Sequence, residues 1–368
     1  MTLPDDLRED LGAVLRAGPD QPLSTYDFQD LALRTFRYQY RTNPVYQAFC
    51  RRRGRHPDDL ASWEDIPPVP TRAFKELPLV SGDPGRVERV FRTSGTTGGR
   101  GRRGEHHVLD LGLYHEALLP NFRAHLLPDG ARLPVVSLIP PGPEAPDSSL
   151  SHMVEVVARH LGAPGGGWFV DAAGRLQERE LSQLLDEHEA AGQPALLVAT
   201  AFALVHWFDV LEGQGRTHRL PEGSRVMETG GFKGRSRELT RDDLYAAIHE
   251  RLGVPADRVV NEYGMTELLS QFYEPVLRDP RAPRRHQPPP WVRTRVLDPV
   301  TLEPVPDGIR GLLTHFDLAN LHSVAHVLTE DEGVAHEGGF HVQGRSSGAE
   351  PRGCSLAMDQ LMAAQRAS

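Results

Sequence analysis

Two short segments carry the residue types best suited to chemistry. The first begins at the end of the predicted strand 89–93 and consists of hydroxyl residues and glycines: Thr93, Ser94, Gly95, Thr96, Thr97, Gly98 and Gly99. Backbone N–H groups and hydroxyls in such a loop bind polyphosphates, and its glycines let the backbone approach closely. The loop lacks the GKS or GKT ending of a Walker A sequence, and a mobile turn has the same composition. By itself it is compatible with a phosphate loop or with a simple connection.

The second segment lies later in the chain, where the predicted strand 257–263 ends. It consists of Asn261, Glu262, Tyr263, Gly264, Met265, Thr266 and Glu267. Active residues of α/β proteins gather where strands end. Tyr263 can stack on a purine, Thr266 can bind a phosphate, and Glu267 offers the oxygen ligand that Mg²⁺ prefers. The alternative is an ordinary helix start, in which Thr266 and Glu267 are first-turn residues.

Taken together, TSGTTGG and NEYGMTE resemble the motifs of the acyl-adenylate-forming superfamily, and further matches follow in order. Gly230 and Gly231 match the glycine-rich strand end that lines the nucleotide and acyl pockets of that family. Asp317 resembles the aspartate that binds the ribose hydroxyls, and Gly344 with Arg345 resembles the hinge pair whose arginine also reaches the ribose. Besides the phosphate loop, the resemblance assigns nucleotide binding to Gly230, Gly231, Glu262, Tyr263, Gly264, Thr266, Asp317 and Arg345.

One branch of the superfamily fits best. The strings PPVPTRAFKE, SSLSHMVE, GGFKGRSREL, NEYGMTELLSQFY, DLANLHSVAHVLTEDEG and GAEPRGCSL resemble the LuxE-type acyl-protein synthetases, and the likeness runs from Ile66 to Leu356. Those enzymes supply activated fatty acid to the reductase of bacterial luminescence systems. The phenylacetate–CoA ligase branch is the next nearest. The resemblance implies an α/β fold of the adenylate-forming type, with layered sheets and a small β-rich subdomain.

The lysines of the sequence set this chain apart from the wider superfamily. Typical members continue into a small C-terminal domain whose lysine orients the carboxylate and the α-phosphate, whereas lysine occurs here only at Lys75 and Lys233. We expect no such lysine domain after Arg345. Lys233, beside the glycine-rich strand end, is the candidate for supporting phosphate or carboxylate charge, against the alternative of a surface lysine. Lys75 is expected to be a solvated surface lysine.

Cys354 also has two interpretations. Free cysteine usually packs as a small apolar residue, and Cys50 within an N-terminal helix is interpreted in that way. In the LuxE-type family the acyl group passes to a cysteine near the C-terminus, and Cys354 matches that position. A thiolate attacks an activated carbonyl readily and leaves easily again, and Arg345 and Arg352 favour its ionisation. His152 is expected to line the acyl pocket, and the sequence shows no zinc-binding pattern.

Composition limits the classes of protein to which the chain can belong. It has 368 residues and a net charge of −9, so no basic excess indicates binding to nucleic acid or to an anionic membrane. Two cysteines cannot form a disulfide framework and suit a reducing cytosol. The longest apolar stretch, 195–208, is too short to cross a bilayer. We therefore expect a cytoplasmic protein.

Strand and helix patterns supply the elements that must position these residues. Beyond 89–93 and 257–263, strands are predicted at 133–140, 167–171, 194–200 and 225–229, and helices are predicted at 106–122, 149–162, 180–192, 201–213 and 240–253. This alternation is typical of a layered α/β sheet. Four consecutive parts are expected: a helical segment 1–90, an α/β core 91–290, a β-rich subdomain 291–345 and a short tail 346–368.

The sequence thus predicts an ATP- and Mg²⁺-dependent enzyme that makes an acyl-adenylate and transfers the acyl group to a thiol. In this prediction Glu267, Lys233 and Cys354 are catalytic, and Glu267 is the metal ligand. The substrate is a fatty or aromatic acid, and the acceptor is Cys354, a partner protein, a carrier protein or CoA. Two alternatives remain open: a free-standing CoA, carrier-protein or amide ligase, and a non-catalytic nucleotide-binding subunit. A partner subunit or self-association is compatible with each.

Overall fold

The computed structural model describes residues 5–94, 102–230, 239–345 and 352–365. The chain forms two compact units. Unit 1 contains Met1–Pro120, Met265–Gln271 and Gln287–Ser368, and unit 2 contains Asn121–Gly264 and Phe272–His286. This division differs from the four consecutive parts expected, because the chain leaves unit 1 and returns to it twice. Within the described ranges, no helix is both long and apolar enough to span a membrane.

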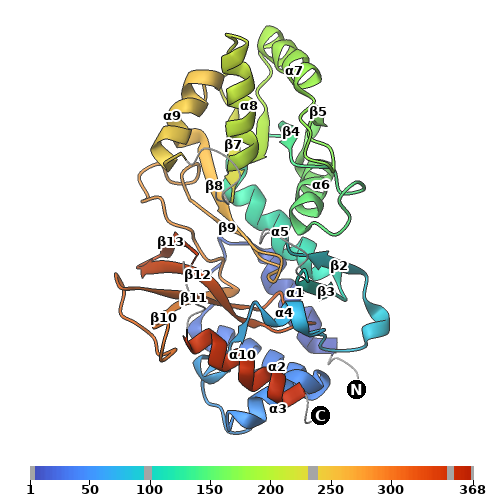
Figure 1. The fold of residues 1–368 in the computed structure, drawn as a ribbon, viewed down its shortest axis with the longest axis vertical. Coiled ribbons are helices and arrows are strands. Elements are labelled where there is room, and N and C mark those ends of the chain that lie inside the picture. The colour runs from blue at the N-terminus through green and yellow to red at the C-terminus, as the bar shows by residue number, and fades with distance from the viewer. Residues whose placement is uncertain (1–4, 95–101, 231–238, 346–351, 366–368) are drawn as a thin grey trace. The chain divides into compact units, whose positions relative to one another are not determined.

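Unit 2 is built on a sheet of six strands (Figure 1). In spatial order these are β5 (Ala163–Trp168), β4 (Pro134–Leu138), β6 (Leu196–Thr200), β7 (Arg225–Thr229), β8 (Val259–Tyr263) and β9 (Phe272–Tyr273). All neighbours are parallel except β8 and β9. The helices that alternate with the strands are α6 (Ser149–Leu161), α7 (Glu178–Ala191), α8 (Ala201–Gly213) and α9 (Arg241–Leu252). The predicted alternation of strands and helices is present.

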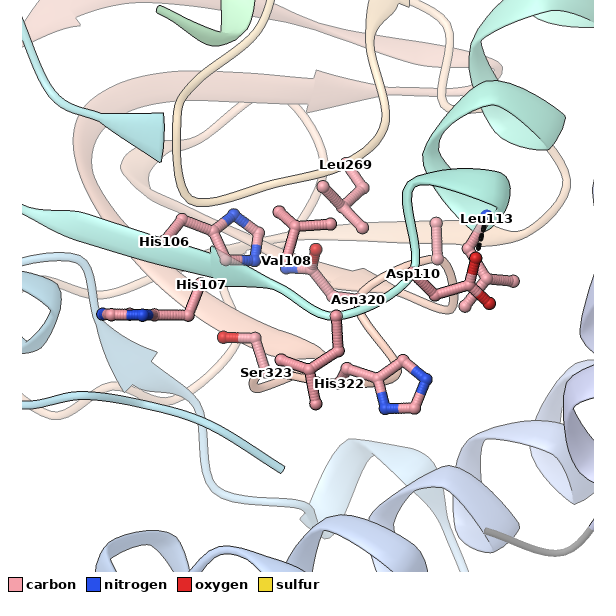
Figure 2. Close-up of a pocket in the computed structure, with 11 residues that line it drawn as sticks. His106, His107, Val108, Asp110, Leu113, Leu269, Asn320, His322 and Ser323 are labelled. Atoms are coloured by element: carbon pink, nitrogen blue, oxygen red, sulfur yellow. Dashed lines mark hydrogen bonds between the residues drawn. The ribbon is translucent and has the colours of Figure 1, made fainter. Parts of the chain in front are cut away.

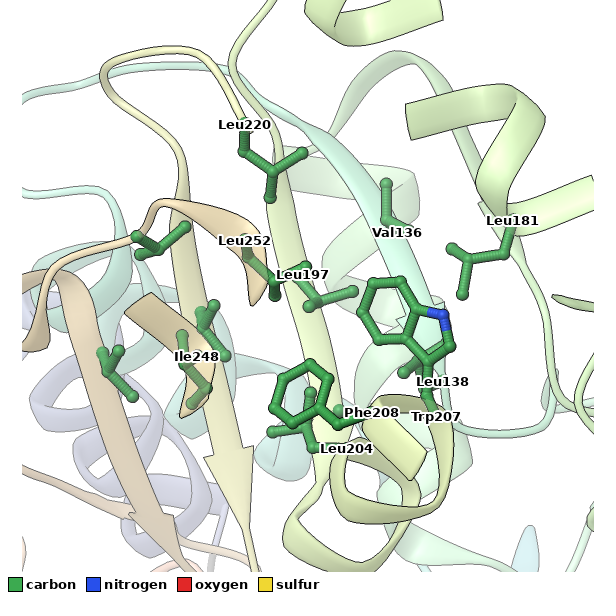
Figure 3. Close-up of a cluster of buried hydrophobic side chains, with 14 of the residues drawn as sticks. Val136, Leu138, Leu181, Leu197, Leu204, Trp207, Phe208, Leu220, Ile248 and Leu252 are labelled. Carbon is green, nitrogen blue, oxygen red and sulfur yellow. The ribbon is translucent and has the colours of Figure 1, made fainter. Parts of the chain in front are cut away.

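The core of unit 2 fixes the strands whose ends carry candidate residues. Val136 on β4, Leu197 on β6 and Val226 on β7 pack with Trp207 of α8 and Ile248 of α9 in one apolar cluster (Figure 3). The strands of a parallel sheet covered by helices are buried on both faces, as β6 and β7 are here. Burial of such a cluster is the main favourable contribution to folding, so the ends of β7 and β8 rest on a rigid base.

Unit 1 contains a mainly antiparallel sheet. Its strands are β1 (Val69–Pro70), β10 (Val292–Leu297), β11 (Arg310–Asp317), β12 (His326–His336) and β13 (Gly339–Arg345). The order is β1-β12-β11-β10, and β13 also pairs with β12. This is the β-rich part expected after residue 291. A separate hairpin joins β2 (Arg89–Arg92) to β3 (Glu105–Val108), on either side of the predicted phosphate loop.

Helices complete unit 1. They are α1 (Asp5–Ala17), α2 (Thr25–Thr42), α3 (Pro44–Arg52), α4 (Ala73–Glu76), α10 (Arg352–Gln365) and the start of α5 (Leu111–Leu126). Asn43 separates α2 from α3: its side chain accepts a hydrogen bond from the backbone N–H of Tyr46 at 3.1 Å, and Pro44 occupies the first helical position. Helix α10 packs against α3 and β1.

Two sequence predictions of local structure are wrong. The helix expected at 106–122 begins only at Leu111, because residues 105–108 pair with β2 as the strand β3. Cross-strand pairing thus outweighs the helical pattern there. The segment after Arg345 was expected to hold one or two helical turns, but α10 has 14 residues. Its apolar face is buried on unit 1, which explains its length.

Candidate functional site

Glu267 is the central candidate residue of unit 1. It lies in the segment 265–271, directly after the strand β8 that ends at Tyr263, and it is 7% exposed. Burial raises the pKa of its carboxyl to about 7. The positive charge of Arg345 lowers this pKa, whereas the negative charges of Asp331 and Glu330 raise it. Glu267 therefore lies in an acidic environment that a positive ion would stabilise.

Arg345 and Asp331 form an ion pair within that environment. They lie opposite each other on β13 and β12, and the Arg345 Nε donates to Asp331 Oδ1 at 3.3 Å. Gly344, next to Arg345, has a φ of +124°, a conformation that favours glycine. The side chain of Arg345 is 65% exposed, so its guanidinium has access to solvent. This arrangement presents one cation and one carboxylate at the edge of the sheet beside Glu267.

The described ends of the predicted phosphate loop are held by the β2–β3 hairpin. The backbone N–H of Gly104 donates to Thr93 Oγ1 at 2.9 Å, and Arg103 Nε donates to the Thr93 carbonyl oxygen at 2.5 Å. Ser94 is exposed. The remaining predicted residues, Gly95, Thr96, Thr97, Gly98 and Gly99, lie outside the described residues. The hairpin thus anchors both ends of the segment that the sequence assigns to phosphate binding.

Asp317 is a buried member of the unit 1 hydrogen-bond network. It ends β11, is fully buried, and its two carboxylate oxygens accept four hydrogen bonds from unit 1 itself. Burial raises its pKa to about 6, and these donors oppose the rise. A carboxylate whose lone pairs are occupied in this way has little capacity left for further donors. The ribose role of Asp317 stays a prediction.

The candidate residues of unit 2 lie at and after the ends of β7 and β8. Glu262 is buried, accepts a hydrogen bond from the Thr229 hydroxyl, and has its pKa raised by burial to about 7. The Tyr263 ring lies 5.7 Å from the ring of His286, centre to centre. Gly230 is exposed and has a φ of +76°. Gly231 and Lys233 lie outside the described residues.

Cys354 lies in the first turn of α10 and is 2% exposed. Its side chain packs in a cluster with Leu297, Leu302, Leu312 and Leu328 of the unit 1 sheet. An acyl-adenylate reaches this sulfur only if the start of α10 leaves the sheet. The Cys354 thiol is therefore packed like that of an ordinary core cysteine.

Cys50, Lys75 and His152 lie among the described residues on helices. Cys50 is buried in α3, and burial raises the pKa of its thiol well above the ordinary value. Lys75 is half-buried on α4, and His152 is half-buried on α6. Among the described residues, no group of three or more His, Cys, Asp or Glu side chains is placed to hold a metal ion.

The structure adds three residues that the sequence analysis did not single out. Asp331, within the quoted string LTEDEG, pairs with Arg345 and influences Glu267. Asn320 and His106 each donate to a backbone carbonyl of the segment 265–271. The acidic string around Asp331 was the available signal, whereas nothing in the local sequence distinguishes His106 or Asn320 from other polar residues.

Comparison with known proteins places these features in a family. The family model for acyl-protein synthetases of the LuxE type matches residues 24–363. The chain is 25% identical over 343 residues to a long-chain-fatty-acid–luciferin-component ligase of Vibrio harveyi, covering 90% of this chain and 86% of that one. It is 23% identical to the ligase of the same name from Aliivibrio fischeri, over 83% of this chain and 79% of the relative. The predicted resemblance is confirmed.

Solved structures confirm the predicted fold. A 2-hydroxyisobutyryl-CoA ligase, solved in an open conformation with 2-HIB-AMP and CoA, matches with a TM-score of 0.61 and 17% identity over 85% of this chain. The chain spans 66% of that ligase. McyG A-PCP, solved with phenylalanyl-adenylate, matches with a TM-score of 0.50 and 14% identity over 72% of this chain and 48% of its own length. The architecture is that of adenylate-forming ligases.

Proposed function

Because this chain belongs to the LuxE family of acyl-protein synthetases, we propose that it activates a long-chain fatty acid with ATP and transfers the acyl group to a thiol. The enzyme class is an acyl-adenylate-forming ligase. The observation that carries the proposal is that Glu267, the last residue of the motif NEYGMTE, lies within electrostatic reach of the Arg345–Asp331 ion pair in unit 1. The choice of a fatty acid rests on the names of the two luminescence relatives.

In the first step a carboxylate oxygen of the fatty acid attacks the α-phosphorus of ATP. The bond to the bridging oxygen breaks, pyrophosphate leaves, and an acyl-adenylate forms. Such a displacement needs alignment of the reactants and neutralisation of charge more than covalent help. Thr93 and the glycines that follow it would hold the leaving pyrophosphate, and Lys233 would support phosphate or carboxylate charge. Tyr263 and the strand end at Gly230 would flank the adenine ring.

We assign the ribose to Asp331 and Arg345 in place of Asp317. Asp331 lies on β12, opposite Arg345 on β13, and the side chain of Arg345 is 65% exposed, so a ribose bound at this strand pair would meet both groups. Asp317, by contrast, is occupied by four donors. We expect Asp331→Ala to raise the KM for ATP by about tenfold, as loss of a charge-assisted hydrogen bond does.

The residues present fit a magnesium ion that binds with the nucleotide. Glu267 offers one buried carboxylate in an acidic environment, and Mg²⁺ is commonly held by one or two carboxylates together with substrate phosphates. When bound, the ion would neutralise phosphate charge in the transition state. Thr266, the neighbour of Glu267, would contact the phosphates. The guanidinium of Arg345 supplies a further positive charge at this edge.

In the second step a thiolate attacks the acyl carbonyl, the bond to the AMP oxygen breaks, and a thioester forms. We propose Cys354 as the first acceptor, which requires the first turn of α10 to leave its leucine cluster. A cysteine of a partner protein, a carrier-protein thiol and CoA are the other acceptors. The two leading alternatives to this function are a CoA or carrier-protein ligase and a non-catalytic nucleotide-binding subunit.

ATP–pyrophosphate exchange tests the proposal. We expect exchange that depends on long-chain fatty acids, exceeds that with aromatic or amino acids, and falls by about 10²–10³-fold in Glu267→Ala. Cys354→Ala should keep exchange but lose covalent labelling by radioactive fatty acid. Labelling that survives Cys354→Ala would exclude Cys354 as acceptor. Tight ATP binding without exchange for any acid would favour the nucleotide-binding subunit.

A further inference from the structure

The segment 265–271 is bound to unit 1 mainly through its backbone. The carboxylate of Asp317 accepts from the backbone N–H groups of Leu269 and Ser270 at 3.1 and 3.0 Å, and from the Ser270 hydroxyl at 2.8 Å. The Trp291 indole N–H donates to the same hydroxyl oxygen at 3.0 Å. These contacts fix the C-terminal half of the segment to the end of β11.

The N-terminal half is held on both sides of Glu267. The Asn320 amide nitrogen donates to the Glu267 carbonyl oxygen at 2.8 Å, and His106 Nδ1 lies 2.7 Å from the Thr266 carbonyl oxygen. Because a carbonyl only accepts, Nδ1 must carry the ring proton. Burial lowers the pKa of His106 to about 4, so the ring is neutral in this tautomer. Two consecutive carbonyls are therefore fixed, whereas the side chains of Thr266 and Glu267 are not part of these bonds.

The three side chains that hold the segment, those of His106, Asp317 and Asn320, come from two different parts of unit 1. His106 is on β3, whereas Asp317 and Asn320 flank the turn after β11, and Ala319 N–H donates to Asp317 Oδ1 at 3.0 Å within that turn. All three are buried. Figure 2 shows His106, Asn320 and Leu269 around a cavity of about 10 Å³, so the packing between these parts is close.

We infer that Asp317, Asn320 and His106 form a clasp that positions Thr266 and Glu267 for nucleotide activation. The inference rests on the proposed function, since it gives the clasp a role only through the activity of Glu267. The three residues are positioning residues, because their polar atoms are bonded to the protein backbone. With the clasp broken, the segment can shift, and a displacement of about 1 Å at a reacting group costs about 10²-fold in rate.

Single substitutions with matched controls separate positioning from a general loss of stability. The clasp variants are Asp317→Ala, Asn320→Ala and the milder Asn320→Ser. The controls are Thr314→Val and Ser323→Ala. Thr314 lies on β11, the strand that Asp317 ends, and its buried hydroxyl donates to the Val327 carbonyl oxygen. The buried hydroxyl of Ser323 donates to the Leu79 carbonyl oxygen. Each control loses a buried hydrogen bond of unit 1 without touching the segment 265–271.

Hydrogen–deuterium exchange of the segment 265–271 gives a readout that does not depend on activity. In Asp317→Ala we expect the backbone amides of Leu269 and Ser270 to exchange about tenfold faster or more, with little change in the two controls. Asn320→Ser, which supplies a hydroxyl donor in place of the amide, should show a smaller increase than Asn320→Ala. Equal exchange in clasp variants and controls would overturn the inference.

Kinetics then test the link to Glu267. We expect the clasp variants to lower kcat of ATP–pyrophosphate exchange by about 10- to 100-fold with little change in the KM for ATP, whereas Asp331→Ala should act mainly on KM. Added to Glu267→Ala, a clasp substitution should cost almost nothing more. Independent, multiplying losses would overturn the clasp while leaving the proposed function intact. Wild-type activity in Glu267→Ala would overturn the proposed function itself.

Discussion

Buried carboxylates are treated differently in the two units. Asp317 in unit 1 accepts four hydrogen bonds, three of them from backbone N–H groups. Glu262 in unit 2 accepts from the Thr229 hydroxyl, and Glu228 accepts from Tyr245 and Asn261. Burial raises the pKa of Asp317 to about 6 and that of each glutamate to about 7. Asp317 thus acts as an anion that holds backbone N–H groups in place, whereas Glu262 and Glu228 are readily protonated members of a neutral network.

The largest effect is expected where a carboxylate organises backbone. Asp317→Asn replaces one acceptor by an NH₂ donor facing the N–H groups of unit 1. We expect the free energy of unfolding to fall by about 2–3 kcal/mol, because buried donors lose their acceptor. Glu262→Gln, the matched change in unit 2, keeps an acceptor for Thr229 and should cost less than about 1 kcal/mol. Urea unfolding of both variants measures the two losses in free energy of unfolding, and equal losses would contradict the distinction between Asp317 and Glu262.

The dependence of stability on pH sharpens the comparison in unit 2. The folded pKa of Glu262 lies above its ordinary value of 4.5, so the folded state binds more protons between about pH 4.5 and 7. Stability should therefore fall as pH rises through this window. Glu262→Gln should reduce that fall by about 1–2 kcal/mol, and the other carboxyls with raised pKa, those of Glu228, Glu267 and Asp317, should supply what remains. Thermal unfolding from pH 5 to 8 provides the test, and an unchanged slope would contradict it.

For Asp129 in unit 2, we expect a pH dependence of stability of the opposite sign and the smallest effect of substitution. Asp129 pairs with the buried Arg225 through two hydrogen bonds, at 2.8 and 3.1 Å, and this contact lowers the Asp129 pKa to about 2. Its contribution is present above the ordinary pKa of 3.8 and is lost as pH falls toward 2. Since Asp129 is half-exposed, Asp129→Asn should cost less than about 1 kcal/mol at pH 7. In an acid titration of Asp129→Asn, the stability should show no further loss that comes from the Asp129–Arg225 pair.

The sequence predicts the elements of unit 2 well because strand and helix periodicity are local properties. The helix 201–213 and the strand 225–229 are found with the expected bounds. It does not predict that residues 265–271 belong to unit 1, because that depends on hydrogen bonds to distant residues such as His106 and Asp317. The same limit explains why sequence patterns do not single out Asp331, because only the pairing of β12 with β13 brings it opposite Arg345.

The nucleotide products of a single turnover test the central claim most directly. The protein would be mixed with ATP labelled at the α-phosphate, a long-chain fatty acid and Mg²⁺, quenched in acid and analysed by mass spectrometry and chromatography. We predict pyrophosphate in an amount equal to fatty acyl-AMP plus AMP, the AMP arising from acyl transfer to Cys354, and at least about 100-fold slower formation of all three by Glu267→Ala. Formation of ADP and an acyl phosphate, or recovery of unchanged ATP with every fatty acid, would contradict adenylation by this chain.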